Sequence, residues 1–189
     1  MTSWLCGYCS RRAPVNEVNN PRNPDPQPLM SRDDTMMKTG FTQSPSGQVW
    51  DHKGKTDLVQ IFISHSDDAI NFLQFQYDEN AHLVLSVPSL AMIVGTRFNT
   101  VKLNYPGEFL TSISGSYSDT NGYKVTSITF DTNLRRYGPF GQQRQCDREF
   151  IFQMGQDKQF GGFHFSTMNG HLESIGVYVK PITTPNKPA

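Results

Sequence analysis

Cysteine and histidine are the residues of this chain that most readily take part in metal, redox or acid-base chemistry. Cys6 and Cys9 form the tetrapeptide Cys-Gly-Tyr-Cys, whose spacing suits half of a zinc site, a redox pair, or two acceptors for reversible acylation. Zinc needs four ligands, but Cys146 is far along the chain and no histidine lies near the pair. A redox pair should open a helix after a strand, whereas a proline-rich stretch follows here. We therefore predict two exposed thiols, with acylation next in order because apolar and basic residues flank the pair.

Patterns of catalytic residues are missing from the sequence. The histidines, at positions 52, 65, 82, 164 and 171, show no metal-ligand spacing such as His-X-His. The sequence also contains no Gly-X-Ser-X-Gly elbow, P-loop or His-Glu-X-X-His motif. Asp67-Asp68 is typical of a solvated turn, and Cys146 has no evident base beside it. We predict that the protein is not an enzyme and needs no metal or other cofactor.

The charge balance argues against nucleic-acid binding. The chain has 17 lysines and arginines and 17 aspartates and glutamates, which gives a net charge of zero. Affinity for nucleic acid grows with the number of phosphates neutralised, so a neutral chain offers no general attraction. The charged fraction, 18%, is below the roughly 25% of typical soluble domains. Neutrality favours uncharged ligands or protein partners.

Proline divides the chain into tails and a folded unit. Five of the 12 prolines lie in residues 1–38, and three lie in residues 180–189. Repeated X-Pro steps oppose helix, and residues 15–28 show no apolar period. We predict a disordered proline- and asparagine-rich tail over residues 1–36, one domain over 37–180 and a short tail over 181–189.

The sequence predicts an intracellular protein. It has no run of 18 apolar residues, and residues 1–6 lack the basic and apolar character of a secretory signal. An Asn-X-Ser/Thr glycosylation site does not occur in it either. We therefore expect a cytoplasmic or nucleocytoplasmic location without a transmembrane segment, in which the cysteines stay reduced.

Short apolar or alternating runs, separated by turn residues, fill the chain from residue 57 onward. Residues 58–63 and 69–77 flank a polar stretch, which is a strand-turn-strand pattern. No window of 12 residues shows a helical stripe. At least nine strands without helices between them predict an all-β sandwich, barrel or prism. The further runs are residues 82–87, 98–103, 108–113, 124–130, 149–154, 162–165 and 175–179.

Several separated motifs, taken in order, resemble the jacalin-related plant lectins. Gly40 and the pair Trp50-Asp51 are similar to the family's opening glycine-rich loop and its Trp-Asp pair. The resemblance covers roughly residues 37–180, and several motifs in one order are specific. The other matching segments are 103–115 (Leu-Asn-Tyr-Pro-Gly-Glu-Phe-Leu-Thr-Ser-Ile-Ser-Gly), 127–133, 137–141 (Tyr-Gly-Pro-Phe-Gly), 161–164 and 172–178 (Leu-Glu-Ser-Ile-Gly-Val-Tyr).

The resemblance implies an all-β prism, in which three Greek-key sheets of about four strands each surround a shared apolar core. In such a fold, Pro106-Gly107-Glu108 would start a strand after a tight turn. Residues 138–141 would form a turn that places Phe140 against the core. Gly176 would allow two strands to approach closely. Most of the recognisable motif therefore concerns structure.

The resemblance also implies a metal-free sugar site where three loops converge at one end of the prism. Lectins of this type bind mannose or galactose, and a carboxylate flanked by backbone N–H donors recognises vicinal hydroxyls. Gly40 represents the opening loop, in which only Gly47 restores the usual glycine-rich run. Gly122 and Tyr123 represent the middle loop, where the Tyr123 ring would either stack on a sugar or belong to a surface turn.

In the last loop, Glu173 occupies the position of the family's aspartate. Asn169 stands four residues earlier, and the N–H groups of Gly170 and His171 would assist the carboxylate, unless His171 is only an exposed turn residue. Glutamate is one methylene longer than aspartate, which displaces its oxygens by roughly 1 Å. The loop is also one residue longer than usual, so the predicted site departs from the pattern of the family.

Two functions remain open from the sequence. The first is a lectin that binds mannose-type glycans or glycoproteins through these loops, with a role in plant stress or defence implied by the resemblance. The second is a protein-interaction module of the same fold with a degenerate sugar site, which would use the proline-rich tail or a face of the prism. A homo-oligomer is compatible with both, because avidity compensates for weak single sites.

Overall fold

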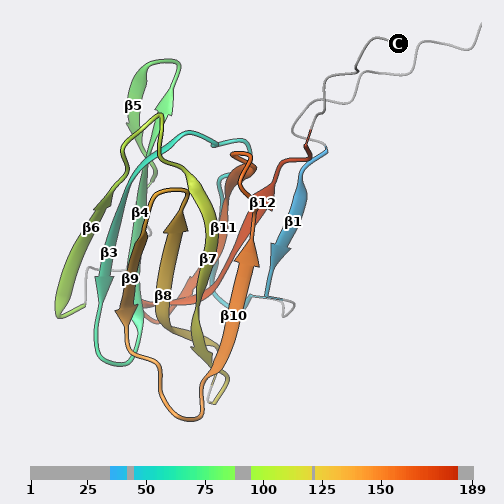
Figure 1. Cartoon of the computed structure of the whole chain (residues 1–189). Coiled ribbons are helices and arrows are strands. Elements are labelled where there is room, and N and C mark those ends of the chain that lie inside the picture. Colours follow the sequence, from blue (N-terminus) through green and yellow to red (C-terminus); the bar gives the residue numbers. More distant parts are fainter. Residues whose placement is uncertain (1–34, 42–44, 88–94, 121, 183–189) are drawn as a thin grey trace, which may run out of the picture.

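A computed structural model of the chain describes residues 35–41, 45–87, 95–120 and 122–182. These residues form twelve β-strands and no helix (Figure 1), so no described helix could cross a membrane. The all-β prediction is confirmed, and each of the nine predicted runs overlaps a strand. The strands are β1 (Met37–Gly40), β2 (Gln48–Asp51), β3 (Leu58–His65), β4 (Ile70–Glu79), β5 (His82–Leu85), β6 (Arg97–Lys102), β7 (Leu110–Ser118), β8 (Lys124–Thr132), β9 (Arg136–Gly141), β10 (Arg148–Gln153), β11 (Phe160–Met168) and β12 (His171–Val179).

The strands form three antiparallel sheets of four strands each. Their orders are β1-β12-β11-β2, β10-β7-β8-β9 and β5-β4-β3-β6. In the last two sheets, the fourth strand along the chain lies beside the first, which is the Greek-key order. In the first sheet, β1 and β2 pair with β12 and β11, so both ends of the described chain meet there. The predicted β-prism is confirmed.

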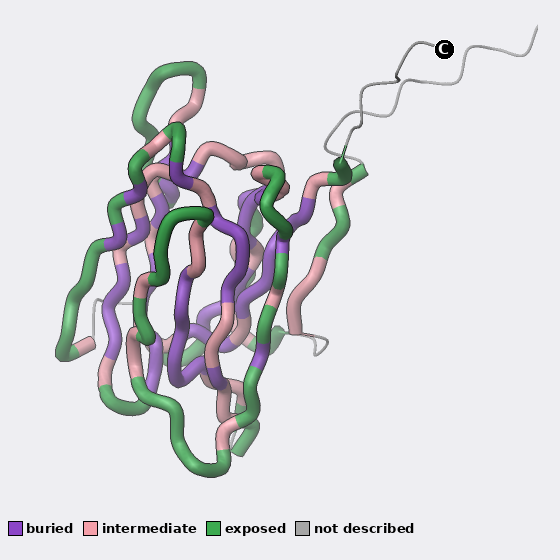
Figure 2. Tube along the Cα trace, viewed as in Figure 1, coloured by how far each residue is buried: buried purple, intermediate pink, exposed green. Residues whose placement is uncertain are grey.

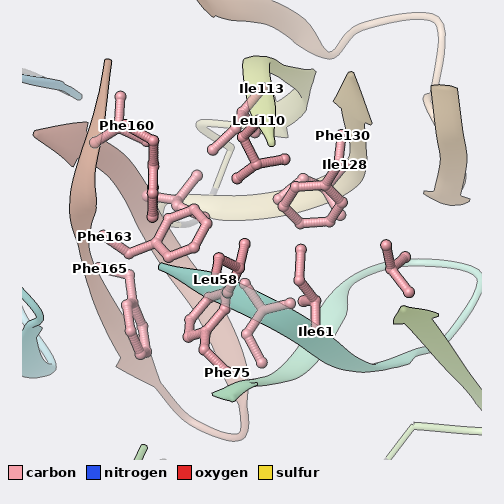
Figure 3. Close-up of a cluster of buried hydrophobic side chains, with 14 of the residues drawn as sticks. Leu58, Ile61, Phe75, Leu110, Ile113, Ile128, Phe130, Phe160, Phe163 and Phe165 are labelled. Atoms are coloured by element: carbon pink, nitrogen blue, oxygen red, sulfur yellow. The ribbon is translucent and has the colours of Figure 1, made fainter. Parts of the chain in front are cut away.

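The apolar faces of the three sheets meet in one core (Figures 2 and 3). Phe75 on β4, Phe130 on β8 and Phe163 on β11 are fully buried, and each comes from a different sheet. The rings of Phe75 and Phe163 stack with their centroids 4.1 Å apart. Full burial of a side chain of this size contributes about 1.5–3 kcal/mol. Alternating apolar residues on strands from all three sheets thus hold the prism together.

The turn predicted at Pro106-Gly107-Glu108 is present, and Glu108 has a further structural role. The N–H groups of Gly107 and Glu108 donate to the carbonyl of Asn104, and β7 begins two residues after Glu108. The buried Glu108 carboxylate accepts hydrogen bonds from the Asn104 N–H and from the hydroxyls of Thr132 and Tyr137. It therefore ties the start of β7 to the end of β8 and to β9.

The prediction of a turn at residues 138–141 is wrong. These residues belong to β9, which pairs with β8 at the edge of its sheet. An edge strand tolerates Pro139, because one side of the strand needs no N–H donor. The register shifts between Ile128 and Phe130, so pairing continues through a bulge where the sequence suggested a chain reversal. Phe140 nevertheless packs against the core as predicted.

The predicted tails lie almost wholly beyond the described residues. β1 begins at Met37 and β12 ends at Val179, both within the predicted domain of residues 37–180. Residues 1–34 and 183–189, with Cys6 and Cys9, lie outside the described residues, so the predictions of disorder and of free thiols there stay predictions. Cys146 is a free, exposed cysteine.

Gly162 provides a sharp test of the packing between β11 and the chain after β2. Its φ is 119°, and a Cβ atom there would lie 2.0 Å from the carbonyl oxygen of His52. We expect Gly162→Ala to lower the free energy of unfolding by about 3 kcal/mol or more, measured by urea denaturation. The matched control is Gly107→Ala, whose new Cβ would meet nothing closer than 3.6 Å and should change stability by less than about 1 kcal/mol. Equal stability of the two variants would contradict this packing.

Candidate functional site

The three loops of the predicted sugar site meet at one end of the prism, the lower end in Figure 1. The opening loop lies between β1 and β2, the middle loop between β7 and β8, and the last loop between β11 and β12. Backbone N–H groups of the opening loop donate to Glu173 on β12. His171, at the start of β12, lines one cavity together with Gly122 of the middle loop. The last loop therefore connects the other two.

The carboxylate of Glu173 is buried and is bonded from several sides. Glu173 is only 2% exposed. Its carboxylate oxygens accept hydrogen bonds from the N–H groups of Ser46 at 2.8 Å and Gly47 at 3.1 Å. Each carboxylate oxygen thus accepts one backbone N–H of the opening loop. The side chains of Ser166 and Ser46 add to the lowering of the pKa of Glu173. Burial opposes ionisation, yet the hydrogen bonds dominate and hold the pKa of Glu173 below its ordinary value.

A bulge in β12 explains why Glu173 points inward. Ser166 pairs with Ser174 and Thr167 pairs with Leu172, so Glu173 is an extra residue without a partner on β11. A bulge of this kind redirects a side chain, and the additional methylene of glutamate extends its oxygens to the opening loop. The longer loop predicted from the sequence thus has a structural counterpart, and it places the carboxylate against the protein's own N–H groups.

Gly40 does not belong to the group of residues around Glu173. It lies in β1 opposite Gly176 of β12, and a Cβ atom at Gly40 would come within 2.6 Å of the His164 ring. That ring also hydrogen-bonds to the Thr39 carbonyl through its Nε2 atom. Glycine at this position is therefore explained by close strand packing. The backbone donors that reach Glu173 come from Ser46 and Gly47, which sequence reasoning did not assign; the short run Pro45-Ser46-Gly47 before β2 is the signal that could have identified them.

The middle loop presents Gly122 and Tyr123 as predicted, but the tyrosine ring already has an aromatic neighbour. Gly122 is exposed, and a Cβ atom there would meet nothing within 4 Å. The ring of Tyr123 is half-buried, with its centroid 6.1 Å from that of Tyr117. Stacking of Tyr123 on a sugar stays a prediction.

The last loop is a two-residue turn that buries part of His171. Asn169 and Gly170 both have positive φ, as a tight hairpin turn requires. The side chain of Asn71 donates to the Gly170 carbonyl at 3.2 Å and braces the turn. His171 is half-buried, so its description as an exposed turn side chain is wrong. Burial, and after it the charge of Lys124, lower the pKa of His171.

A cavity of about 320 Å³ opens beside these loops. Gly122 and His171, two of the predicted site residues, line it, whereas Glu173 does not. The described residues contain no cluster of three or more histidine, cysteine, aspartate or glutamate side chains that could hold a metal ion. The other lining residues are Ser118, Thr120, Lys124 and Arg144.

The fold and the three-loop end define a β-prism of the lectin type. The model of the Jacalin-like lectin domain family matches residues 40–178, and the chain belongs to that family. Among curated relatives, Protein RESTRICTED TEV MOVEMENT 1 of Arabidopsis thaliana is 39% identical over 71% of this chain and 78% of its own length. Jacalin-related lectin 2 of the same plant is 33% identical over 70% of this chain and 77% of its own length.

Solved structures of lectins share the fold. A mannose-specific jacalin-related lectin from Morus nigra, solved in complex with mannose, superposes with a TM-score of 0.65 at 25% identity, over 77% of this chain and 95% of that one. Frutapin, a lectin from Artocarpus incisa, gives the same TM-score and identity, over 77% of this chain and 97% of its own. The resemblance predicted from the motifs is therefore confirmed at the level of the family.

The hydrogen bonds to Glu173 predict a pH-dependent contribution to stability. Glu173→Gln should lower the free energy of unfolding at neutral pH by about 1–3 kcal/mol, because the NH2 of the new amide would face the N–H of either Ser46 or Gly47 and leave that donor without an acceptor. The folded pKa of Glu173 is lowered, so the contribution is present above the ordinary value of 4.5 and is lost as the pH falls through the folded pKa. The gap between wild type and variant should therefore narrow in acid.

Chemical denaturation at a series of pH values measures that gap. Glu149→Gln on β10 is the matched control, because Glu149 is exposed and its change should stay within about 0.5 kcal/mol. A Glu173→Gln variant as stable as the control at neutral pH would show that the carboxylate is not held in this way.

Proposed function

We propose that this chain is a protein-interaction module of the Jacalin-like lectin family. In this proposal, the carboxylate at the centre of the monosaccharide site binds the protein's own backbone N–H groups in place of a sugar. The observation that carries the proposal is the bonding of Glu173. Recognition of a sugar by that carboxylate requires accessible acceptor oxygens, whereas the residue is only 2% exposed and each of its oxygens already accepts a backbone N–H of the opening loop. A sugar would have to displace the opening loop and break the hydrogen bonds from Ser46 and Gly47 to the carboxylate, at a cost of about 1–3 kcal/mol for each buried group left without a partner.

An exposed apolar edge strand supports the contact with a protein. Within the described residues β5 pairs only with β4, so its other edge has N–H and C=O groups without strand partners. Leu83 is 62% exposed, and Val84, Leu85 and Val87 are exposed as well. These residues define the β5 edge, which projects at the end of the prism away from the three loops (Figures 1 and 2).

The chemistry of the β5 edge suits an extended, apolar segment of another protein. Proteins usually protect an exposed edge with charged residues or proline, but residues 82–87 (His-Leu-Val-Leu-Ser-Val) contain no lysine, arginine, aspartate, glutamate or proline. Addition of a strand from a partner would satisfy the backbone groups and bury the apolar side chains. A role in plant stress or defence is part of this proposal. It is supported by the relative named for restricted TEV movement, which is 39% identical to this chain.

A second candidate function is weak binding of mannose-type glycans through the middle and last loops. The observation in its favour is the cavity of about 320 Å³ that Gly122 and His171 line. The mannose complex of the Morus nigra lectin, at 25% identity over most of this chain, supports the same candidate. In this version His171 and the middle loop would contact the sugar, and Glu173 would only hold the opening loop in place.

Sugar binding separates the two candidates. We expect the wild-type chain to show no saccharide-competable binding on a glycan array at high protein density, and no heat of binding with millimolar methyl α-mannoside. Glu173→Ala should leave both results unchanged. Any binding that mannoside competes away would contradict the first proposal. Binding that survives Glu173→Ala would support the second candidate, and binding that Glu173→Ala abolishes would support recognition of the sugar by the carboxylate itself.

The β5 edge is tested by comparing two matched surface changes. For the double variant Leu83→Lys/Leu85→Lys, we expect the amounts of the proteins that wild type enriches from plant tissue to fall at least about tenfold. Quantitative mass spectrometry measures these amounts. The control Ile151→Lys changes a residue 59% exposed on the distant strand β10 and should retain them. Equal capture by both variants, or elution by free mannoside, would contradict the proposed contact. Circular dichroism confirms that each variant is folded.

A further inference from the structure

The cavity beside the middle loop is not used by the protein contact proposed above. It is bounded by the end of β7, the start of β8, the β9–β10 loop and the start of β12, at the lower end of the prism in Figure 1. Its volume of about 320 Å³ is at the lower end of the usual range for small-ligand pockets. Its lining combines hydroxyl groups, an imidazole and two cationic side chains: Ser118, Thr120, Gly122, Lys124, Arg144 and His171.

Positive charge dominates the lining of this cavity. Lys124 and Arg144 line it, and no carboxylate does. The Nζ atom of Lys124 lies 3.1 Å from the exposed carboxylate of Asp68. Hydrogen bonds from Ser66 and Lys124 lower the pKa of Asp68, and the charges of Lys124 and Arg144 add to this effect.

The Arg144 guanidinium is available to a ligand. Among the described residues it has no ion-pair or hydrogen-bond partner, although the Arg144 backbone N–H donates to Asp147 at 2.9 Å. The same Asp147 oxygen accepts the hydroxyl of Thr126, so this carboxylate ties the β9–β10 loop to β8. One carboxylate, Asp68, thus pairs with a lining cation, and the second cation remains unpaired.

The rest of the cavity lining consists of hydroxyl groups and of Gly122, which has no side chain. The Ser118 oxygen accepts the Thr120 N–H at 3.4 Å, which leaves the Ser118 hydroxyl hydrogen able to donate. A Cβ atom at Gly122 would meet nothing within 4 Å, so this side of the cavity is unobstructed. Donors therefore outnumber acceptors among the side chains that face the cavity.

We propose that this cavity binds an oxyanion, namely the phosphate or sulfate group of a small ligand. An oxyanion presents several acceptor oxygens, which match the guanidinium of Arg144, the ammonium of Lys124 and the hydroxyl of Ser118. A neutral hexose would satisfy the hydroxyls but would leave the charge of Arg144 without a counterpart, because only Lys124 is paired, with Asp68. The inference is independent of the protein contact at the β5 edge, which lies at the opposite end of the prism.

His171 reports on the charge in the cavity. Burial and the positive charge of Lys124 lower its pKa, while the carbonyls of Tyr123 and Asn169 and the more distant charge of Glu173 raise it. A bound anion next to the ring would stabilise the imidazolium and raise the pKa of His171. A ligand bound elsewhere would leave that pKa unchanged.

The experiment is a titration of the full chain with sodium sulfate and with inorganic phosphate, at ionic strength held constant with sodium chloride. Two-dimensional NMR should show saturable shifts of the Lys124, Arg144 and His171 amides and a raised pKa of His171. Arg144→Met should weaken binding about tenfold. Arg136→Met is the control: its guanidinium forms a surface ion pair with Asp131 on β8 and does not line the cavity, so affinity should be unchanged.

Two results would overturn the proposal. One is the absence of saturable shifts, and the other is equal weakening by Arg144→Met and Arg136→Met, which would indicate general electrostatic attraction. Mannose 6-phosphate and mannose distinguish the source of the anion. Tighter binding of mannose 6-phosphate than of phosphate would identify a phosphorylated sugar, and equal binding would identify the anionic group alone. Binding of mannose as tight as that of mannose 6-phosphate would contradict recognition of an anion.

Discussion

The pairing of the two ends of the folded chain in one sheet is the constraint on which this structure depends. β1 and β2 pair with β12 and β11, so the first and last strands close the prism together. Glu173 on β12 reinforces this closure, because its carboxylate accepts the N–H groups of Ser46 and Gly47 between β1 and β2. A buried carboxylate that lost these donors would be left charged and unpaired, which is strongly unfavourable.

The same hydrogen bonds limit what this end of the prism can bind. The carboxylate that anchors the opening loop is buried and already accepts one backbone N–H at each oxygen. The three-loop architecture of the family is retained, and this carboxylate stabilises it. The two binding sites that we propose instead are the apolar β5 edge at one end of the prism and the cationic cavity at the other. Location in the cell and oligomeric state stay predictions.

Sequence reasoning recovered those parts of the structure that depend on local pattern. Alternating runs located nine of the strands, and ordered motifs identified the prism. It did not recover features that depend on distant partners. The bond between Ser46 and Glu173 joins residues 127 apart, and the run Pro45-Ser46-Gly47 indicates a turn without identifying its distant partner. Gly40 was assigned to the sugar loop, although contact with the distant His164 ring explains it. β9 was taken for a turn because Gly138-Pro139 is typical of turns, and only its place at the edge of a sheet permits a strand. The Asn169-Gly170 turn, by contrast, was readable from two adjacent residues.

The central claim is that the N–H groups of Ser46 and Gly47 are bonded to Glu173 and not available to a sugar. The most direct measurement follows the amide NMR signals of these two residues in two titrations, one with acid and one with methyl α-mannoside. The account predicts that both signals move together as Glu173 becomes protonated below its ordinary pKa of 4.5, and that neither moves with mannoside. Saturable movement with mannoside, without movement as Glu173 is protonated, would contradict it.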